Sequence, residues 1–294
     1  MRSALVALRF PEDVPFDVVA VTPEQLRARA PHEVSRSETM NYRTMAPEPG
    51  GLFDPQVFGP GTVIDAPVPS GDDMIKPRRT WFARLPLTVP MVNPLLVDHA
   101  CGQLAELTGR DATALAKAST DLADSRALVA ELEAKHPWMI VRELAVLPPD
   151  LRPLKLDEHM RWALTPINMW YQRIVDRNAR LKRQLEQGTP DAQLESDWTN
   201  IQVAVRGLFE NDEANAPMLD AEGEPMPSLR TLAASTQKLV ATLSEIAAQG
   251  APLAIDAPRA STAEMAAADL VPARHYIAKA VLFALGFELA STRG

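Results

Sequence analysis

Two runs of apolar residues, separated by a short turn signal, constrain the fold of this chain more than any other feature. The first run recurs at helical spacing from Pro166 to about Gly188, and the second starts at Leu194 and advances in steps of four and three residues. The apolar positions are Ile167, Trp170, Ile174, Leu181 and Leu185, then Leu194, Trp198, Ile201, Val205 and Leu208. The turn GTPD, at 188–191, has glycine where a helix ends and proline where the next begins. The pattern predicts an antiparallel helical hairpin with a coiled-coil seam.

Short extended segments precede this hairpin. Residues 16–21, FDVVAV, are predicted to form a strand, and Thr22 with Pro23 has the pattern of a capped helix start. Residues 83–90 are expected to form an edge strand, because their prolines cannot donate to a sheet. Residues 138–154 are expected to be a strand followed by a proline-rich turn. These features predict an α+β chain, mainly α, with short irregular β segments.

Further helices are expected on both sides of the hairpin. Residues 98–135 have a helical composition that is broken near Gly109. A helix is expected from Leu229 to Ala248, and a final amphipathic helix over 274–290. The acidic, turn-rich stretch 211–228 is expected to be an exposed linker, and 249–272 a loop.

The loop GGLFDPQVFGPG, from Gly50 to Gly61, combines four glycines and two prolines with several apolar side chains. Glycine and proline rule out a regular helix or strand through the whole stretch. A flexible linker would not carry the apolar groups of Leu52, Phe53 and Phe58. These three side chains are therefore expected to anchor an irregular loop in the core.

Bulk composition excludes several classes of function. The chain has 294 residues, 46% of them hydrophobic, and a formal net charge of -8, which argues against nucleic-acid binding by the molecule as a whole. The single cysteine, Cys101, excludes a disulfide framework and a cysteine-rich zinc site. No signal-peptide pattern begins the chain, and the longest apolar run, 280–287, is too short to span a bilayer. A soluble, cytoplasmic protein is expected.

No sequence pattern indicates catalysis. The five histidines lack a metal-ligand spacing, and neither a phosphate-binding glycine loop nor a Gly-x-Ser-x-Gly elbow is present. An enzyme is therefore not expected, nor is any cofactor or bound metal.

The most distinctive charged pattern lies on the first helix of the hairpin. Its members, called the arginine stripe below, are Arg173, Arg177, Arg180 and Arg183. Their steps of four, three and three residues place them on one face. Two interpretations stand: a solvated helix face, or a docking surface whose guanidinium groups bind carboxylates or phosphates.

Three long stretches of the sequence resemble the N-terminal clamp region of the bacterial RNA polymerase beta-prime subunit. They are TPEQLRARAPHEVSRSETMNYRTMAPEPGGLFDPQVFGP at 22–60, ELAVLPPDLRPL at 143–154, and YQRIVDRNARLKRQLEQGTPD at 171–191. The resemblance covers roughly 16–97 and 136–213, in the family's order. It implies a clamp-like fold in four parts: a segment 1–97, a shortened helical insert 98–137, a strand and hairpin 138–215, and an acidic linker with C-terminal helices 216–294.

The sequence also departs from the family. The four-cysteine zinc ribbon that follows the glycine-rich loop in the family has no counterpart in 61–85. The magnesium-binding segment Asn-Ala-Asp-Phe-Asp-Gly-Asp and the basic segment after the coiled coil are missing. The resemblance therefore implies a truncated paralogue without polymerase activity of its own and with weak or no nucleic-acid binding.

In the family, the coiled coil binds region 2 of sigma factor. Carried over residue by residue, the contact positions are Arg177, Arg180, Leu181, Arg183, Asp197, Gln202 and Ala204, and the stripe adds Arg173. Two departures oppose the inference, because Glu195 replaces a usual arginine and Gln193 a usual aliphatic residue. A reversed charge disfavours the original partner, so either the partner or its charge must differ.

Three functions follow from this resemblance. The first is a non-catalytic protein that binds a sigma factor or a related transcription protein through the hairpin. The second is a subunit of a split or phage-type multisubunit RNA polymerase, with the catalytic segment on another chain. The third is a clamp-derived scaffold with a partner outside transcription, suggested by residues 216–294, which match nothing in the family pattern.

Overall fold

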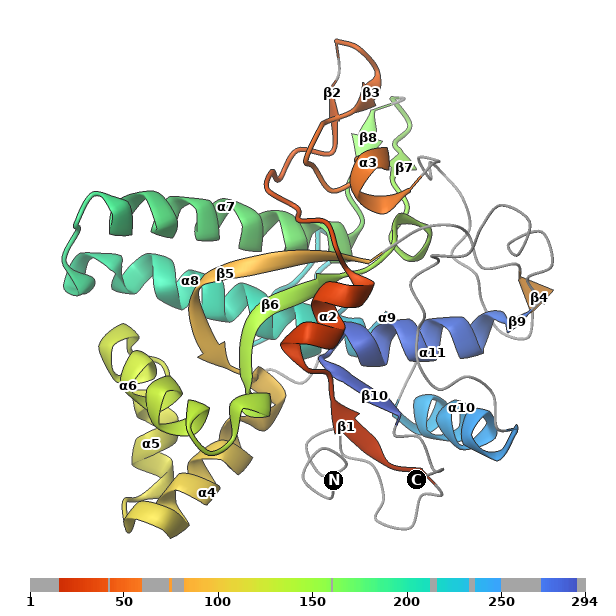
Figure 1. Ribbon diagram of the computed structural model, residues 1–294. Helices are drawn as coiled ribbons and strands as arrows, with labels where there is room; N and C mark the ends of the chain where they lie inside the picture. Colours follow the sequence, from red (N-terminus) through yellow and green to blue (C-terminus); the bar gives the residue numbers. More distant parts are fainter. Residues whose placement is uncertain are drawn as a thin grey trace.

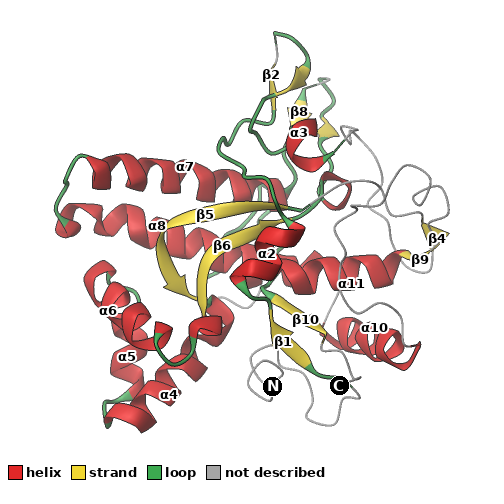
Figure 2. Ribbon diagram, in the orientation of Figure 1, coloured by secondary structure: helices red, strands yellow, loops and turns green. Residues whose placement is uncertain are grey.

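The computed structural model describes residues 16–41, 43–59, 74–75, 82–159, 161–211, 216–232, 236–249 and 271–289. Helices dominate this part of the chain, and its strands form five two-stranded antiparallel sheets (Figures 1 and 2). The predicted class, mainly α with short β segments, is confirmed.

The helical hairpin consists of α7 (Pro166–Glu186) and α8 (Asp191–Glu210), which lie side by side (Figure 1). Gly188 adopts a φ of 73° in the turn, and Pro190 is the N-cap residue of α8, as the sequence predicts. Every predicted seam residue is buried except Leu185, which is half-buried. The ring of Trp170 packs onto the backbone of α8 at Gly207, so that the hairpin is closely packed at its base.

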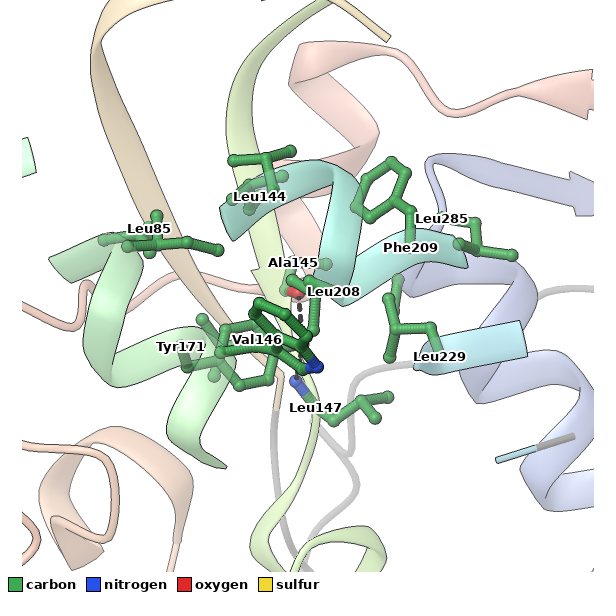
Figure 3. Packing of buried hydrophobic residues seen from close by; sticks show 14 of the residues in the cluster. Leu85, Leu144, Ala145, Val146, Leu147, Tyr171, Leu208, Phe209, Leu229 and Leu285 are labelled. Carbon is green, nitrogen blue, oxygen red and sulfur yellow. Dashed lines mark hydrogen bonds between the residues drawn. The ribbon is translucent and has the colours of Figure 1, made fainter. Parts of the chain in front are cut away.

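A long two-stranded sheet supports the hairpin. It pairs β5 (Ala83–Val92) with β6 (Ile140–Val146), and the Tyr171 hydroxyl of α7 donates to Ala145 O at 3.0 Å and accepts from Leu147 N at 3.2 Å (Figure 3). On the other edge of β5, the backbone of residues 32–34 pairs with Arg84, and the Asn178 side chain closes the edge at Pro86 and Thr88. Its amide accepts from Thr88 N at 2.7 Å and donates to Pro86 O at 2.9 Å, as a neighbouring strand would.

The insert forms three helices: α4 (Val97–Thr108), α5 (Ala112–Ala118) and α6 (Leu122–Glu133). The predicted break at Gly109 is present, with a φ of 71°. A second break, at 119–121, was not predicted. Asp121 explains it, because its carboxylate accepts from the amides of Ala123 and Asp124 and so starts a new helix.

The N-terminal part alternates short strands and turns. β1 (Val18–Ala20) leads into α2 (Pro23–Arg29), whose predicted cap at Thr22 forms a full capping box with Gln25. β2 (Met40–Asn41), β3 (Ala46–Pro47) and α3 (Pro55–Phe58) follow. The predicted loop anchors Leu52, Phe53 and Phe58 are each at most 2% exposed, which confirms their place in the core.

The remaining elements are 3-10 turns and short strand pairs. The 3-10 turns are η1 (Pro94–Leu96), η2 (Pro137–Met139) and η3 (Pro149–Leu151). β7 (Lys155–Leu156) pairs with β8 (Trp162–Ala163), and β4 (Met74–Ile75) pairs with β9 (Val271–Pro272).

The C-terminal part corrects one sequence prediction. A helix was predicted over 274–290, but α11 (Ala273–Ala284) ends earlier and β10 (Phe287–Leu289) follows. Gly286 has a φ of 90°, which stops the helix, and β10 then pairs with β1, with Leu289 opposite Val18. The first and last described segments therefore lie side by side (Figure 1).

Within the predicted helix from Leu229 to Ala248 the structure describes α9 (Leu229–Leu232) and α10 (Thr236–Gln249), and residues 233–235 lie outside the described residues. The predicted linker 211–228 has an exposed turn at 220–224, but hydrogen bonds join the residues on either side of this turn. Asn211 Nδ2 donates to the carbonyls of Met218 and Met226. Most of the loop predicted over 249–272 lies outside the described residues.

Candidate functional site

Two arginines of the stripe converge on one buried carboxylate. Arg180 Nε lies 2.9 Å from Asp197 Oδ2, and Arg177 Nη1 lies 3.5 Å from Asp197 Oδ1. The Asp197 side chain is only 5% exposed, whereas those of Arg177 and Arg180 are 44% and 56% exposed. One carboxylate of α8 thus orients two guanidinium groups of α7, and the pair keeps a net positive charge at the surface. Such a pair offers preorganised donors to an incoming carboxylate.

The other two arginines of the stripe have different surroundings. Arg173 contacts the sulfur of Met218, and its guanidinium carbon lies 5.5 Å from the centroid of the Trp170 ring. Arg183 is exposed in the last turn of α7, where a cation is favourable for the helix dipole. The stripe is therefore open from Arg177 to Arg183, whereas Arg173 packs at the base of the hairpin.

The remaining predicted positions lie within the hairpin or face the insert. Leu181 is fully buried and Ala204 is 4% exposed. Gln202 Nε2 donates to Ser119 O in the break before α6, at 2.7 Å. Leu181 and Ala204 therefore pack inside the hairpin. Gln202 already has a hydrogen-bond partner within the chain.

A buried arginine that sequence reasoning missed holds the base of the hairpin. Arg152 is 1% exposed and donates at 2.7 Å to three acceptors, which are Leu147 O, Leu52 O and Asn168 Oδ1. It thereby joins the turn after β6, the glycine-rich loop and α7. Burial lowers the pKa of Arg152 to about 10 and raises that of the neighbouring Tyr171 to about 12. The sequence signal was the pair of charged residues, Asp150 and Arg152, in the otherwise apolar stretch 144–154.

The second basic cluster that stands out in the sequence is only partly described. Lys76, Arg78 and Arg79 lie outside the described residues. Arg84 is 19% exposed and pairs with the carboxylates of Glu33 and Glu143. Arg84 thus has acidic partners within the chain.

The described residues contain neither a candidate metal centre nor a helix that could span a membrane. No group of three or more His, Cys, Asp or Glu side chains there is placed to hold a metal ion. None of the helices in that part of the chain is both long and apolar enough to cross a bilayer.

Comparison with known proteins agrees with the resemblance seen in the sequence. Residues 107–233 match the family described as RNA polymerase Rpb1, domain 1. The chain is 27% identical over 318 residues to the DNA-directed RNA polymerase subunit beta' of Opitutus terrae, an alignment that covers 74% of this chain and 23% of that subunit. It is 28% identical over 311 residues to the same subunit of Clostridium botulinum strain Alaska E43, which covers 73% of this chain and 26% of the relative.

The beta' subunit of Chlamydia caviae is 26% identical over 295 residues, covering 67% of this chain and 21% of that subunit. The chain therefore spans about a quarter of the length of the curated relatives that it matches.

Proposed function

We propose that this chain, which is similar to bacterial RNA polymerase beta' subunits over most of its length, binds a transcription protein through its helical hairpin, without catalysing a reaction itself. The partner that the hairpin fits best is region 2 of a sigma factor. The observation that carries the proposal is the pair Arg177 and Arg180, which Asp197 holds at the surface of α7.

The chemistry of this surface defines what the partner must present. Two half-exposed guanidinium groups, followed by Arg183 one turn further on, favour acidic side chains at helical spacing. Since the surface is exposed to solvent, the attraction is expected to weaken as salt increases. The buried positions Leu181, Asp197 and Ala204 support the surface.

The proposal is tested by titrating a purified sigma region 2 from the host against the full chain and measuring fluorescence anisotropy. Arg177→Gln/Arg180→Gln/Asp197→Asn removes the surface charges together with the buried carboxylate, so that no unpaired charge stays in the hairpin. We expect affinity to fall by about tenfold or more.

In the control variant, two arginines outside the stripe are replaced by glutamine. Arg161→Gln/Arg206→Gln alters two exposed arginines, at 69% and 62% exposure, outside the stripe. The control is expected to keep wild-type affinity. Equal affinity of the wild type and the Arg177/Arg180/Asp197 variant would overturn the proposal, provided that circular dichroism shows all three proteins folded.

A second candidate function follows from what the relatives are. Since they are DNA-directed RNA polymerase beta' subunits, the chain also fits a subunit of a split or phage-type polymerase that assembles with other polymerase chains. A pull-down from the host distinguishes the two functions. Core polymerase subunits retained equally by the wild type and the arginine variant would favour assembly, and a sigma factor lost by the variant would favour the hairpin. Proteins unrelated to transcription would indicate a scaffold.

A further inference from the structure

The insert packs against one flank of α8 through three polar contacts, named the insert contact below. The amide of Leu122, which starts α6, donates to both carboxylate oxygens of Glu195 at 3.0 and 3.2 Å. Arg126 Nη1 donates to both oxygens of Asp191 at 2.6 and 2.7 Å. The third contact is the hydrogen bond from Gln202 to the backbone of the α5–α6 break.

The insert contact and the arginine surface lie on opposite flanks of α8. At 3.6 residues per turn, Asp191, Glu195 and Gln202 fall on one side of the apolar seam, and Asp197 and Ala204 fall on the other. The apolar residues of α6 that support the contact are themselves buried: Leu122, Leu128, Val129 and Leu132. The insert thus contacts one flank of α8 at Asp191, Glu195 and Gln202, and the other flank meets the arginine stripe.

The charges explain why glutamate suits position 195. The first amides of a helix have no partner in the helix and carry a partial positive charge, which a carboxylate stabilises. Asp121 accepts from the amides of Ala123 and Asp124, and Glu195 accepts from that of Leu122. An arginine at position 195 would place a cation beside these amides and close to Arg126. The departure of Glu195 from the family pattern therefore has an intramolecular reason.

We propose that α5 and α6 close the Glu195 flank of the hairpin, so that a partner is confined to the flank that carries Arg177 and Arg180. This inference deepens the proposed function and rests on it for the identity of the partner. The closure itself depends only on contacts within the chain.

The closure is tested without any partner by thiol labelling. Ser125 is 1% exposed on the same face of α6 as Leu122 and Arg126, and its hydroxyl has no hydrogen-bond partner among the described residues, so that Ser125→Cys changes little else. Ser196→Cys is the matched reporter on the exposed side of α8. The natural Cys101 is buried and its contribution is measured in the wild type.

We expect the thiol of Ser125→Cys to react with a maleimide at least about tenfold more slowly than that of Ser196→Cys. Adding Glu195→Arg should accelerate labelling of Ser125→Cys several-fold and leave Ser196→Cys unchanged. Equal labelling of the two reporters in the native protein, or no response to Glu195→Arg, would overturn the closure.

The confinement of the partner is tested with the same sigma region 2 probe. Glu195→Gln and Arg126→Gln should each leave affinity within about twofold of wild type, because neither side chain meets the partner. A tenfold loss in either variant, with slow Ser125→Cys labelling retained, would show that the partner reaches the Glu195 flank and would overturn the confinement. If no variant and no wild-type protein binds the probe, the proposed function fails, and the labelling result still decides whether this flank is closed.

Discussion

The guanidinium of Arg152 lies over the ring of Phe58, with its central carbon 4.7 Å from the ring centroid, although the two residues are distant in sequence. The ring of Phe53 lies 4.9 Å from the same carbon. Cation–π attraction and three hydrogen bonds thus offset the cost of burying this charge. Through Arg152, the glycine-rich loop and the base of the hairpin are joined at one point.

Replacement of Arg152 by lysine is expected to lower the free energy of unfolding by about 2–4 kcal/mol. An ammonium group cannot reproduce the planar fork that reaches Leu147 O, Leu52 O and Asn168 Oδ1 together, and it leaves buried acceptors unpaired. Urea denaturation followed by circular dichroism measures the loss. Arg161→Lys, at a side chain that is 69% exposed, serves as the control and should change stability by less than about 0.5 kcal/mol. Similar midpoints for both variants would contradict the role given to Arg152.

Two glycines in helices are expected to respond in opposite ways to alanine. A Cβ on Gly207 would lie 2.4 Å from the Trp170 ring, so Gly207→Ala should destabilise the protein by about 1–3 kcal/mol despite its better helix propensity. A Cβ on Gly102 in α4 meets nothing within 4 Å, so Gly102→Ala should stabilise by about 0.5–1 kcal/mol. Thermal unfolding of both variants gives the signs. A neutral or stabilising Gly207→Ala would show that the hairpin base is loosely packed.

Because the Asn178 side chain closes the β5 edge, removing its amide donor is expected to lower the free energy of unfolding. Asn178→Asp still accepts from Thr88 N but can no longer donate to Pro86 O, and we expect a loss of about 1–3 kcal/mol at neutral pH. Asn200→Asp is the control, because Asn200 also donates to a backbone carbonyl, but from an exposed site where water can replace it. Chemical denaturation of the two variants should separate them clearly, and equal losses would refute a special role for Asn178.

Stability is expected to decrease below neutral pH, in part through His99. Burial, followed by the nearby His136, lowers the pKa of His99 below the ordinary value of 6.5. The unfolded chain therefore binds a proton more readily than the folded protein, so the contribution is present above about pH 6.5 and is lost as pH falls through the folded pKa. His99→Gln should make the dependence of unfolding free energy on pH less steep between about pH 7.5 and pH 5. An unchanged slope would show that His99 does not titrate differently in the two states.

The local features that the sequence predicted correctly are those set by neighbouring residues. The apolar period from Pro166 to Leu208, the Gly188–Pro190 turn and the N-cap at Thr22 need only helical spacing and backbone preference, and all appear as expected. The apolar side chains of the glycine-rich loop were also predicted correctly to be core anchors. Apolar side chains in an irregular loop are stabilised by burial, because burial removes their surface from water.

Two features that the sequence did not determine depend on distant partners. Residues 287–289, predicted to continue the helix over 274–290, instead form a strand beyond Gly286, because β1 pairs with them. Glu195 was interpreted as a change in a partner surface, but its carboxylate caps α6.

The arginine stripe depends on both the sequence and the tertiary structure. Its spacing on one helix face follows from the sequence, since each residue of a helix turns by a fixed angle. The tertiary fold decided that Asp197 is buried beneath Arg177 and Arg180 and that Arg173 contacts Met218, because α8 and the 216–228 segment lie beside α7. Helical periodicity is a local property of the chain, whereas burial and ion pairing depend on which segments the tertiary fold brings together.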